Sequence, residues 1–220
     1  MTRAPKSPVW DLPIRLFHWL LAALIGFSWW SGKNDHVDWH IWSGIAILTL
    51  LVFRMFWGLV GSSTARFSSF VRGPASVLAY LRGEWRGIGH TPLGALSVVA
   101  MLLAISLQVA LGLVSEDEDG LYAGPLASLV SIDTSEAARD IHEQFLYVVL
   151  ALIGLHLAAI LFYRVVRKKR LIAPIIVGRG DIDPGTEPMR RGKWWAALLC
   201  LAAAFAVTRW VVAGAPPFGP

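Results

Sequence analysis

The sequence predicts an all-α integral membrane protein with five membrane-spanning helices. Of the 220 residues, 55% are hydrophobic and only 16% are charged, and the mean hydropathy is +0.56. A soluble domain has about 25% charged residues. The charged residues are gathered into short stretches, and the apolar intervals between them are about 20 residues long, which is the length a helix needs to cross a bilayer. Composition and spacing together place the chain in lipid.

Five apolar runs are predicted to span the membrane. The first begins near Pro13, is as long as a full span and is followed by no small-residue cleavage pattern, so it is expected to be a retained helix rather than a signal peptide. Gly58 and Gly61 mark the exit of the second run. A loop with Asp133, Glu136 and Asp140 is expected before the fourth. The predicted spans are 13–30, 39–60, 92–114, 137–163 and 194–213.

The segments outside these runs define the expected domain organisation. Residues 1–180 are expected to form one transmembrane domain, residues 181–193 a cytoplasmic linker and residues 194–213 a fifth transmembrane helix. In the second connection, Pro74 is in a position to open a short helix with an apolar stripe. That segment is either an amphipathic helix on the membrane surface or a loop with one helical turn.

Basic residues predict the orientation of the chain through the positive-inside rule. They precede the first span and fill the second and fourth connections, whereas the first and third connections are acidic. The N-terminus is therefore expected in the cytoplasm and the C-terminus in the periplasm of a bacterial inner membrane. The basic residues are Arg3, Lys6, Arg15, Arg66, Arg72, Arg82, Arg86, Arg164, Arg167, Lys168, Lys169, Arg170, Arg179, Arg190, Arg191 and Lys193.

The charge and the cysteine count exclude other classes of protein. The net charge is +5, but the basic residues flank apolar spans and form no nucleic-acid recognition motif, so no nucleic-acid partner is expected. The single cysteine, Cys200, lies in an apolar run. It leaves no disulfide framework, no CxxC pair and no CxxCH motif for covalent haem. A haem in this chain must be held by other ligands.

Four of the six histidines lie inside predicted spans, where coordinating residues are costly and therefore indicate a site. His142 and His156 are 14 residues apart on one predicted helix, so they share a face and differ in depth by about 21 Å. With the predicted orientation, His18 and His156 lie at the inner depth, and His40 and His142 lie at the outer depth. Depth alone therefore pairs His18 with His156 and His40 with His142.

Two imidazole pairs from different helices are what two six-coordinate haems require. Zinc is the alternative metal, but a pair of histidines does not make its four-ligand site. A third reading is that each histidine only packs. Four histidines at two matched depths favour a di-haem bundle, in which saturated coordination leaves electron transfer as the natural role.

Other residues have weaker roles. Arg54 is predicted to share the His40 face near the inner depth, where it either pairs with a haem propionate or extends to the inner headgroups. His90 is expected to cap the third span or contact a propionate rather than ligate iron, and His36 is expected to be a solvated loop residue. Small residues such as Gly112 either allow close helix approach or make room for a haem.

Several motifs together resemble the bacterial cytochrome b561 and nickel-iron-hydrogenase b-type cytochrome family. They are VWDLPIRLFHW, the histidine opening the second span, FRMFWGLVGSSTARFSSF, GHTPLG and the histidine pair of the fourth span. The resemblance covers about Val9 to Gly180. It implies a four-helix di-haem core, assigns the iron ligands to the same four histidines, and implies electron exchange with the quinone pool or a partner redox protein. The fifth span departs from the minimal four-helix pattern.

Three functions follow as expectations. The first is an electron-transfer subunit with two haem b groups, linking quinone or quinol to a redox protein. The second is a stand-alone membrane reductase of a small oxidant such as superoxide or ferric iron. The third is a membrane anchor, either for a hydrogenase or other dehydrogenase or without any redox role. No hydrogenase motif is present in this sequence, and the sequence predicts neither the direction of electron flow nor the oligomeric state.

Overall fold

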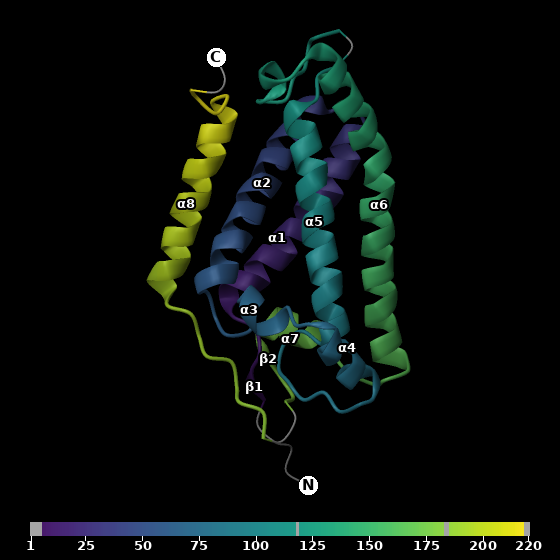
Figure 1. Cartoon of the computed structure of the whole chain (residues 1–220), viewed down its shortest axis with the longest axis vertical. Helices are drawn as coiled ribbons and strands as arrows, with labels where there is room; N and C mark the ends of the chain where they lie inside the picture. Colours follow the sequence, from purple (N-terminus) through teal and green to yellow (C-terminus); the bar gives the residue numbers. More distant parts are fainter. Residues whose placement is uncertain (1–5, 118, 183–184, 218–220) are drawn as a thin grey trace. The chain divides into compact units, whose positions relative to one another are not determined.

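The fold, described by a computed structural model for residues 6–117, 119–182 and 185–217, is built from five long helices and several short elements (Figure 1). The long helices are α1 (Leu12–Lys33), α2 (Val37–Val60), α5 (Pro92–Val114), α6 (Ile132–Val165) and α8 (Trp194–Val212). The short elements are β1 (Ser7–Pro8), α3 (Phe67–Phe70), α4 (Pro74–Leu81), the 3-10 helix η1 (Ala127–Leu129), α7 (Ile172–Val177) and β2 (Arg179–Gly180). Each long helix is long and apolar enough to cross a membrane, as predicted.

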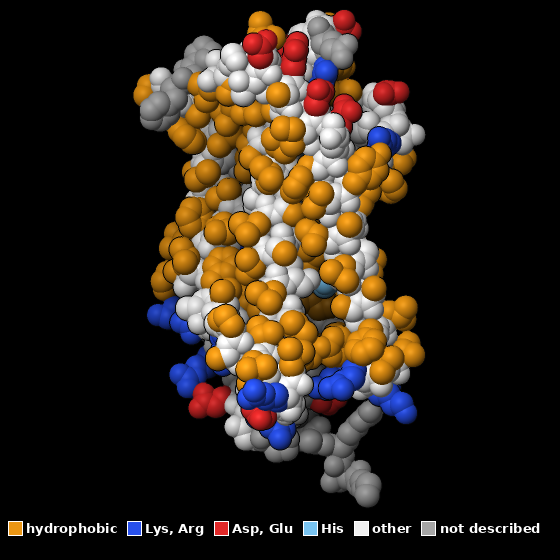
Figure 2. All heavy atoms as spheres, turned by 45° about the vertical axis from the view of Figure 1, so that its right-hand side comes forward, with side chains coloured by type: hydrophobic (Ala, Val, Ile, Leu, Met, Phe, Trp, Pro, Cys, Tyr) orange, Lys and Arg blue, Asp and Glu red, His pale blue; other side chains and the backbone are white. Residues whose placement is uncertain are grey.

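The chain forms two compact units, and each long helix contributes residues to both. The first unit comprises Met1–His18, Arg54–Ala100 and Gly154–Cys200, and the second comprises Trp19–Phe53, Met101–Ile153 and Leu201–Pro220. Many of the large apolar side chains on the long helices are exposed, as the orange surface in Figure 2 shows. Apolar surface of this extent is expected where helices face lipid.

In the first unit, Asp11 fixes the start of α1. Its side chain is 8% exposed, its Oδ1 accepts a hydrogen bond of 2.8 Å from the Ile14 backbone N–H, and its Oδ2 accepts one of 3.1 Å from Trp57 Nε1. The first contact is an N-cap, which satisfies an otherwise unpaired N–H of the first turn. The second ties the start of α1 to the end of α2.

We expect Asp11→Ala to destabilise the protein by about 2 kcal/mol, because it removes both a helix cap and a buried hydrogen bond. Asp11→Asn keeps one oxygen and should lose about half as much. Thermal unfolding of the purified protein in detergent measures both. Equal losses in the two variants would show that the two oxygens do not have separate roles.

The polar segments of the first unit satisfy one another's backbone groups. β1 pairs antiparallel with β2, with Ser7 opposite Gly180, and the Val9 N–H donates to the Gly178 carbonyl at 2.9 Å. The residues before α8 lie across the same region, since the Met189 N–H donates to the Pro8 carbonyl at 3.2 Å. The segment expected to be a linker is therefore held in place at Met189, whose side chain is buried.

In the second unit, α8 packs against α2. Thr49 Oγ1 donates to Thr208 Oγ1 at 3.1 Å, and both side chains are buried. Ala204 and Val211 lie on the same face of α8 and are also buried, whereas Phe205 is 55% exposed. One face of the fifth helix therefore contacts protein, and the opposite face is apolar and open to lipid.

The fourth span begins earlier than predicted. Asp133, Glu136 and Asp140, expected in a loop, lie within α6, the first two of them in its first turns. Ser131 precedes the helix and its Oγ accepts a hydrogen bond of 3.3 Å from the Thr134 N–H. Acidic residues are favourable in a first turn because of the helix dipole, so their charge did not mark a loop.

Two further predictions, one about the end of α2 and one about the start of α5, need correction. α2 ends at Val60, as predicted, with Gly61 directly after it, but Gly58 lies inside the helix. A Cβ on Gly58 would collide with the Phe67 ring, so this glycine makes room for that ring. His90 does not cap α5, because Thr91 Oγ1 accepts the bond from the Gly94 N–H at 3.1 Å. Pro74 does open a helix, α4, as expected.

Candidate functional site

The first histidine pair lies in the first unit. His18 comes from α1 and His156 from α6, and their ring centroids are 6.5 Å apart with an interplanar angle of 49°. Two imidazoles bound to opposite faces of one metal ion have centroids about 6 Å apart, because a metal–nitrogen bond is about 2 Å long. The spacing of these rings is therefore close to that of two axial ligands on one iron.

The second pair lies in the second unit. His40 comes from α2 and His142 from α6, and their centroids are 5.8 Å apart with an interplanar angle of 87°. The structure therefore brings the four histidines together in the two pairs that depth predicts. α6 supplies one histidine to each pair.

Backbone carbonyls orient both rings of the second pair. His40 Nδ1 lies 2.8 Å from the Ser28 carbonyl oxygen, and His142 Nδ1 lies 2.8 Å from the Gln108 carbonyl oxygen. A carbonyl can only accept, so Nδ1 carries the proton in both rings and Nε2 keeps its lone pair. Metal-bound histidines typically donate their other ring N–H in this way, so Nε2 of each ring is the atom available as a metal ligand.

Gln108 also holds His142 by its side chain. Its Nε2 donates to the His142 carbonyl at 2.8 Å, so α5 and α6 exchange two hydrogen bonds at this residue pair. Gln108 is a polar side chain within a span of otherwise apolar character. The requirement for a polar partner in lipid explains why this glutamine is paired with a histidine backbone.

Two glycines leave space for the same rings. A Cβ on Gly32 of α1 would lie 2.9 Å from His40 Nδ1, and a Cβ on Gly112 of α5 would lie 3.0 Å from His142 Cε1. Real Cβ atoms rarely approach so closely, so each ring would have to shift to admit a methyl group, and each ring is hydrogen-bonded to a backbone carbonyl. Of the two readings of Gly112, close approach of a helix to an imidazole is the one that this geometry fits.

Arg54 is buried in the first unit, and one nitrogen of its guanidinium group is available to donate a hydrogen bond. The residue is 2% exposed, and its guanidinium carbon lies 4.5 Å from the centroid of the Phe67 ring. Its Nη1 is buried and has no hydrogen-bond partner among the described residues. The guanidinium does not reach out to headgroups, and a buried N–H of a permanent cation requires an acceptor such as a carboxylate.

The two remaining histidines are not members of these pairs. The His90 ring packs 4.6 Å from both the Trp10 and Phe70 rings. Burial, and secondarily the charge of Arg54, lower the pKa of His90 to about 3, so it is neutral near pH 7. His36 is exposed, and its ring contacts the rings of Trp30 and Trp39, which also contact each other.

The donor set fits haem better than zinc. No group of three or more His, Cys, Asp or Glu side chains within the described ranges is arranged to hold a metal ion, and a structural zinc site needs four ligands. Paired imidazoles with a buried arginine nearby provide what haem b needs, namely two axial nitrogens and a partner for a propionate. The residues present therefore fit this cofactor.

Several residues of the site were missed by sequence reasoning. Gly32 lies beyond the predicted first span, 13–30, although α1 continues to Lys33. Ser28 acts through its carbonyl, which no side-chain pattern indicates. The role of Gln108 could have been predicted from the sequence, because an amide side chain in the middle of an apolar span requires a polar partner.

Paired histidines from separate apolar helices define the class as a helical membrane cytochrome of the b type. A model of the prokaryotic cytochrome b561 family matches residues 9–178 of this chain. The match covers more than half of the sequence, and the chain belongs to that family, as its motifs predicted. It is therefore a prokaryotic membrane protein that binds haem b and takes part in electron transfer. No curated protein and no solved structure matched the chain in the same comparisons.

Proposed function

We propose that this protein carries electrons across the inner membrane through two haem b groups, between the quinone pool and a partner redox protein. His18 and His156 would hold one haem, and His40 and His142 the other. Haem b, when bound, supplies a one-electron redox centre. The observation that carries the proposal is the presence of two imidazole pairs, with centroids 6.5 Å and 5.8 Å apart.

The role of the protein residues in this proposal is to hold and orient. The Ser28 and Gln108 carbonyls keep the second pair in the neutral tautomer that binds through Nε2. Two histidines per iron leave no open coordination position, which favours electron transfer over oxygen chemistry.

We propose the same topology that the sequence predicts. Residues 1–180 would form the haem-binding domain, residues 181–193 a cytoplasmic linker and residues 194–213 the fifth span. The N-terminus would lie in the cytoplasm and the C-terminus in the periplasm, because basic residues dominate the connections assigned to the inside. Arg3, one of the basic residues used for this assignment, lies outside the described residues. Labelling of introduced Ser7→Cys and Ala213→Cys with a membrane-impermeant thiol reagent, in intact cells and in inverted membrane vesicles, tests this orientation, since Ala213 is exposed.

The decisive experiment is a haem count with spectroscopy. A reduced-minus-oxidised spectrum of the purified protein, combined with the protein concentration, should give about two haems per chain. Reduction by a quinol analogue in liposomes that contain a trapped acceptor tests the transmembrane path. Turnover with superoxide or ferric iron but none with quinols would favour the stand-alone reductase, and a ratio near zero would favour a non-redox anchor.

Arg54 gives a further prediction. We propose that its Nη1 pairs with a propionate of the haem held by His18 and His156, since it is buried and has no partner among the residues described. Loss of a positive charge near iron favours the ferric state, so Arg54→Gln should lower the midpoint potential of one haem by on the order of 50 mV. Potentiometric titration measures this shift.

Arg54→Lys and Arg209→Gln are the controls for this measurement. Lysine keeps the charge and should keep most of the potential. Arg209 is an exposed residue of α8, and its substitution should leave both potentials unchanged. An unchanged potential in Arg54→Gln would show that the guanidinium has another partner.

A further inference from the structure

A cavity of about 350 Å³ lies in the first unit, beside the connection between α2 and α5. Its walls come from two parts of the chain that are far apart in sequence. Residues 63–92 supply Arg66, Arg72 and His90, and residues 186–190 supply Arg190. Neither His18 nor His156 lines it among the described residues.

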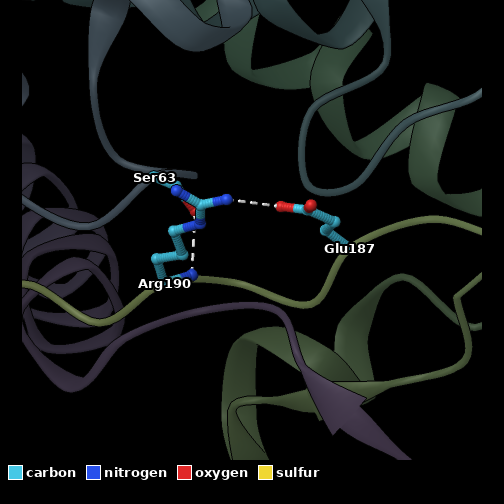
Figure 3. A network of polar contacts seen from close by, with 3 residues as sticks. All are labelled: Ser63, Glu187 and Arg190. Carbon is cyan, nitrogen blue, oxygen red and sulfur yellow. Dashed lines mark hydrogen bonds and ion pairs between the residues drawn. The ribbon is translucent and has the colours of Figure 1, made fainter.

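The cavity is positively charged. Three arginines line it, against one acidic residue, Glu187. Glu187 is paired with Arg190, because its Oε2 accepts a hydrogen bond of 2.8 Å from Arg190 Nη2 (Figure 3). Arg66 Nε is buried and has no hydrogen-bond partner among the residues that the structure describes. The wall therefore presents an unused cationic donor that requires an anion.

The arrangement of the wall is held in place by the backbone. The Ser63 N–H donates to the Arg190 carbonyl at 3.0 Å, and the Arg190 N–H donates to Ser63 Oγ at 3.0 Å, as Figure 3 shows for the second of these bonds. Arg72 Nε donates to the Ser69 carbonyl at 3.1 Å, which orients its guanidinium. A preorganised wall binds with less loss of side-chain entropy.

The remaining lining is partly apolar and partly hydroxylic. Phe70 and Trp85 form an aromatic side, and Ser69 and Thr186 add hydroxyl groups. Such a lining suits a ligand with an anionic group and a less polar body. A cation would be repelled by the arginines, and His90 is neutral and offers a further N–H.

We propose that this cavity binds a phosphate group, either of an anionic phospholipid or as free phosphate. Arginine forks match the geometry of phosphate oxygens and give strong charge-assisted hydrogen bonds. Basic pockets beside membrane helices are known to receive lipid headgroups. A volume of about 350 Å³ accommodates a phosphate together with part of a glycerol body.

The test uses the full-length, haem-loaded protein in detergent. Native mass spectrometry with added dioleoylphosphatidylglycerol or dioleoylphosphatidylcholine measures lipid binding, and calorimetry with inorganic phosphate measures binding of the free anion. The variant is Arg66→Gln with Arg72→Gln. The control is Arg82→Gln with Arg86→Gln, which removes the same charge from exposed positions of the same connection that do not line the cavity.

The double variant is expected to bind phosphatidylglycerol at least about tenfold more weakly, while the control and the binding of phosphatidylcholine stay unchanged. That result supports the lipid as the source of the phosphate. Weaker binding of inorganic phosphate with unchanged lipid binding supports the free anion. If the double variant is not monodisperse, Arg72→Gln alone, an exposed position, should still weaken binding severalfold.

Two results would overturn the proposal. One is equal binding by the variant and the control, or no saturable binding of either probe. The other is a changed Soret band and haem ratio in the double variant with phosphate and lipid binding intact, since the arginines would then serve a haem propionate.

Discussion

His156→Ala is expected to lower the haem content of the purified protein from about two per chain to about one. The substitution removes one of two axial nitrogens, and His18, whose ring centroid lies 6.5 Å from that of His156, cannot hold a six-coordinate iron alone. His40 and His142 lie in the other unit and keep their carbonyl bonds, so their haem should remain. The ratio of haem to protein and a potentiometric titration measure the outcome.

The matched experiment is His142→Ala, which should remove the other haem and leave the potential of the first. His36→Ala is the control, because His36 is exposed and should affect neither haem. Retention of two haems in His156→Ala would refute the pairing of His18 with His156. Loss of both haems would show that the two sites do not form independently.

The class of fold was predictable because lipid imposes simple rules on a sequence. A run of about 20 apolar residues has few alternatives to a spanning helix, and five such runs correspond to α1, α2, α5, α6 and α8. Two histidines 14 residues apart on one helix must share a face. These rules depend only on local sequence, so they gave the spans and the pairing of histidines by depth. Ligation of iron by these histidines stays a prediction.

The parts that were not predictable depend on contacts between elements. The cap at Asp11 is local, but its bond to Trp57 joins two helices. The start of α6 was placed too late because acidic residues suit a loop and the first turn of a helix equally well. The carbonyls of Ser28 and Gln108 carry no side-chain signature, since every residue has one.

The role of Gly32 shows the same limit most clearly, because a glycine before a lysine at a helix end looks like an ordinary terminal residue. In the structure it lies inside α1, and a Cβ at this position would be 2.9 Å from His40 Nδ1. The His40 ring is held there by the Ser28 carbonyl at 2.8 Å. The glycine is therefore required by a neighbouring helix rather than by its own backbone.

Gly32→Ala is accordingly expected to weaken binding of the haem held by His40 and His142 by about tenfold or more, the range seen when a partner that orients a metal-bound histidine is lost. The methyl group must displace the imidazole, and the displaced ring loses its Nδ1 bond. Haem titration of apoprotein, followed by the Soret band, measures the change. Gly26→Ala on the same helix is the control, since a Cβ there meets no atom within 4 Å. Normal affinity in Gly32→Ala would mean that His40 binds no iron, or binds it in another orientation.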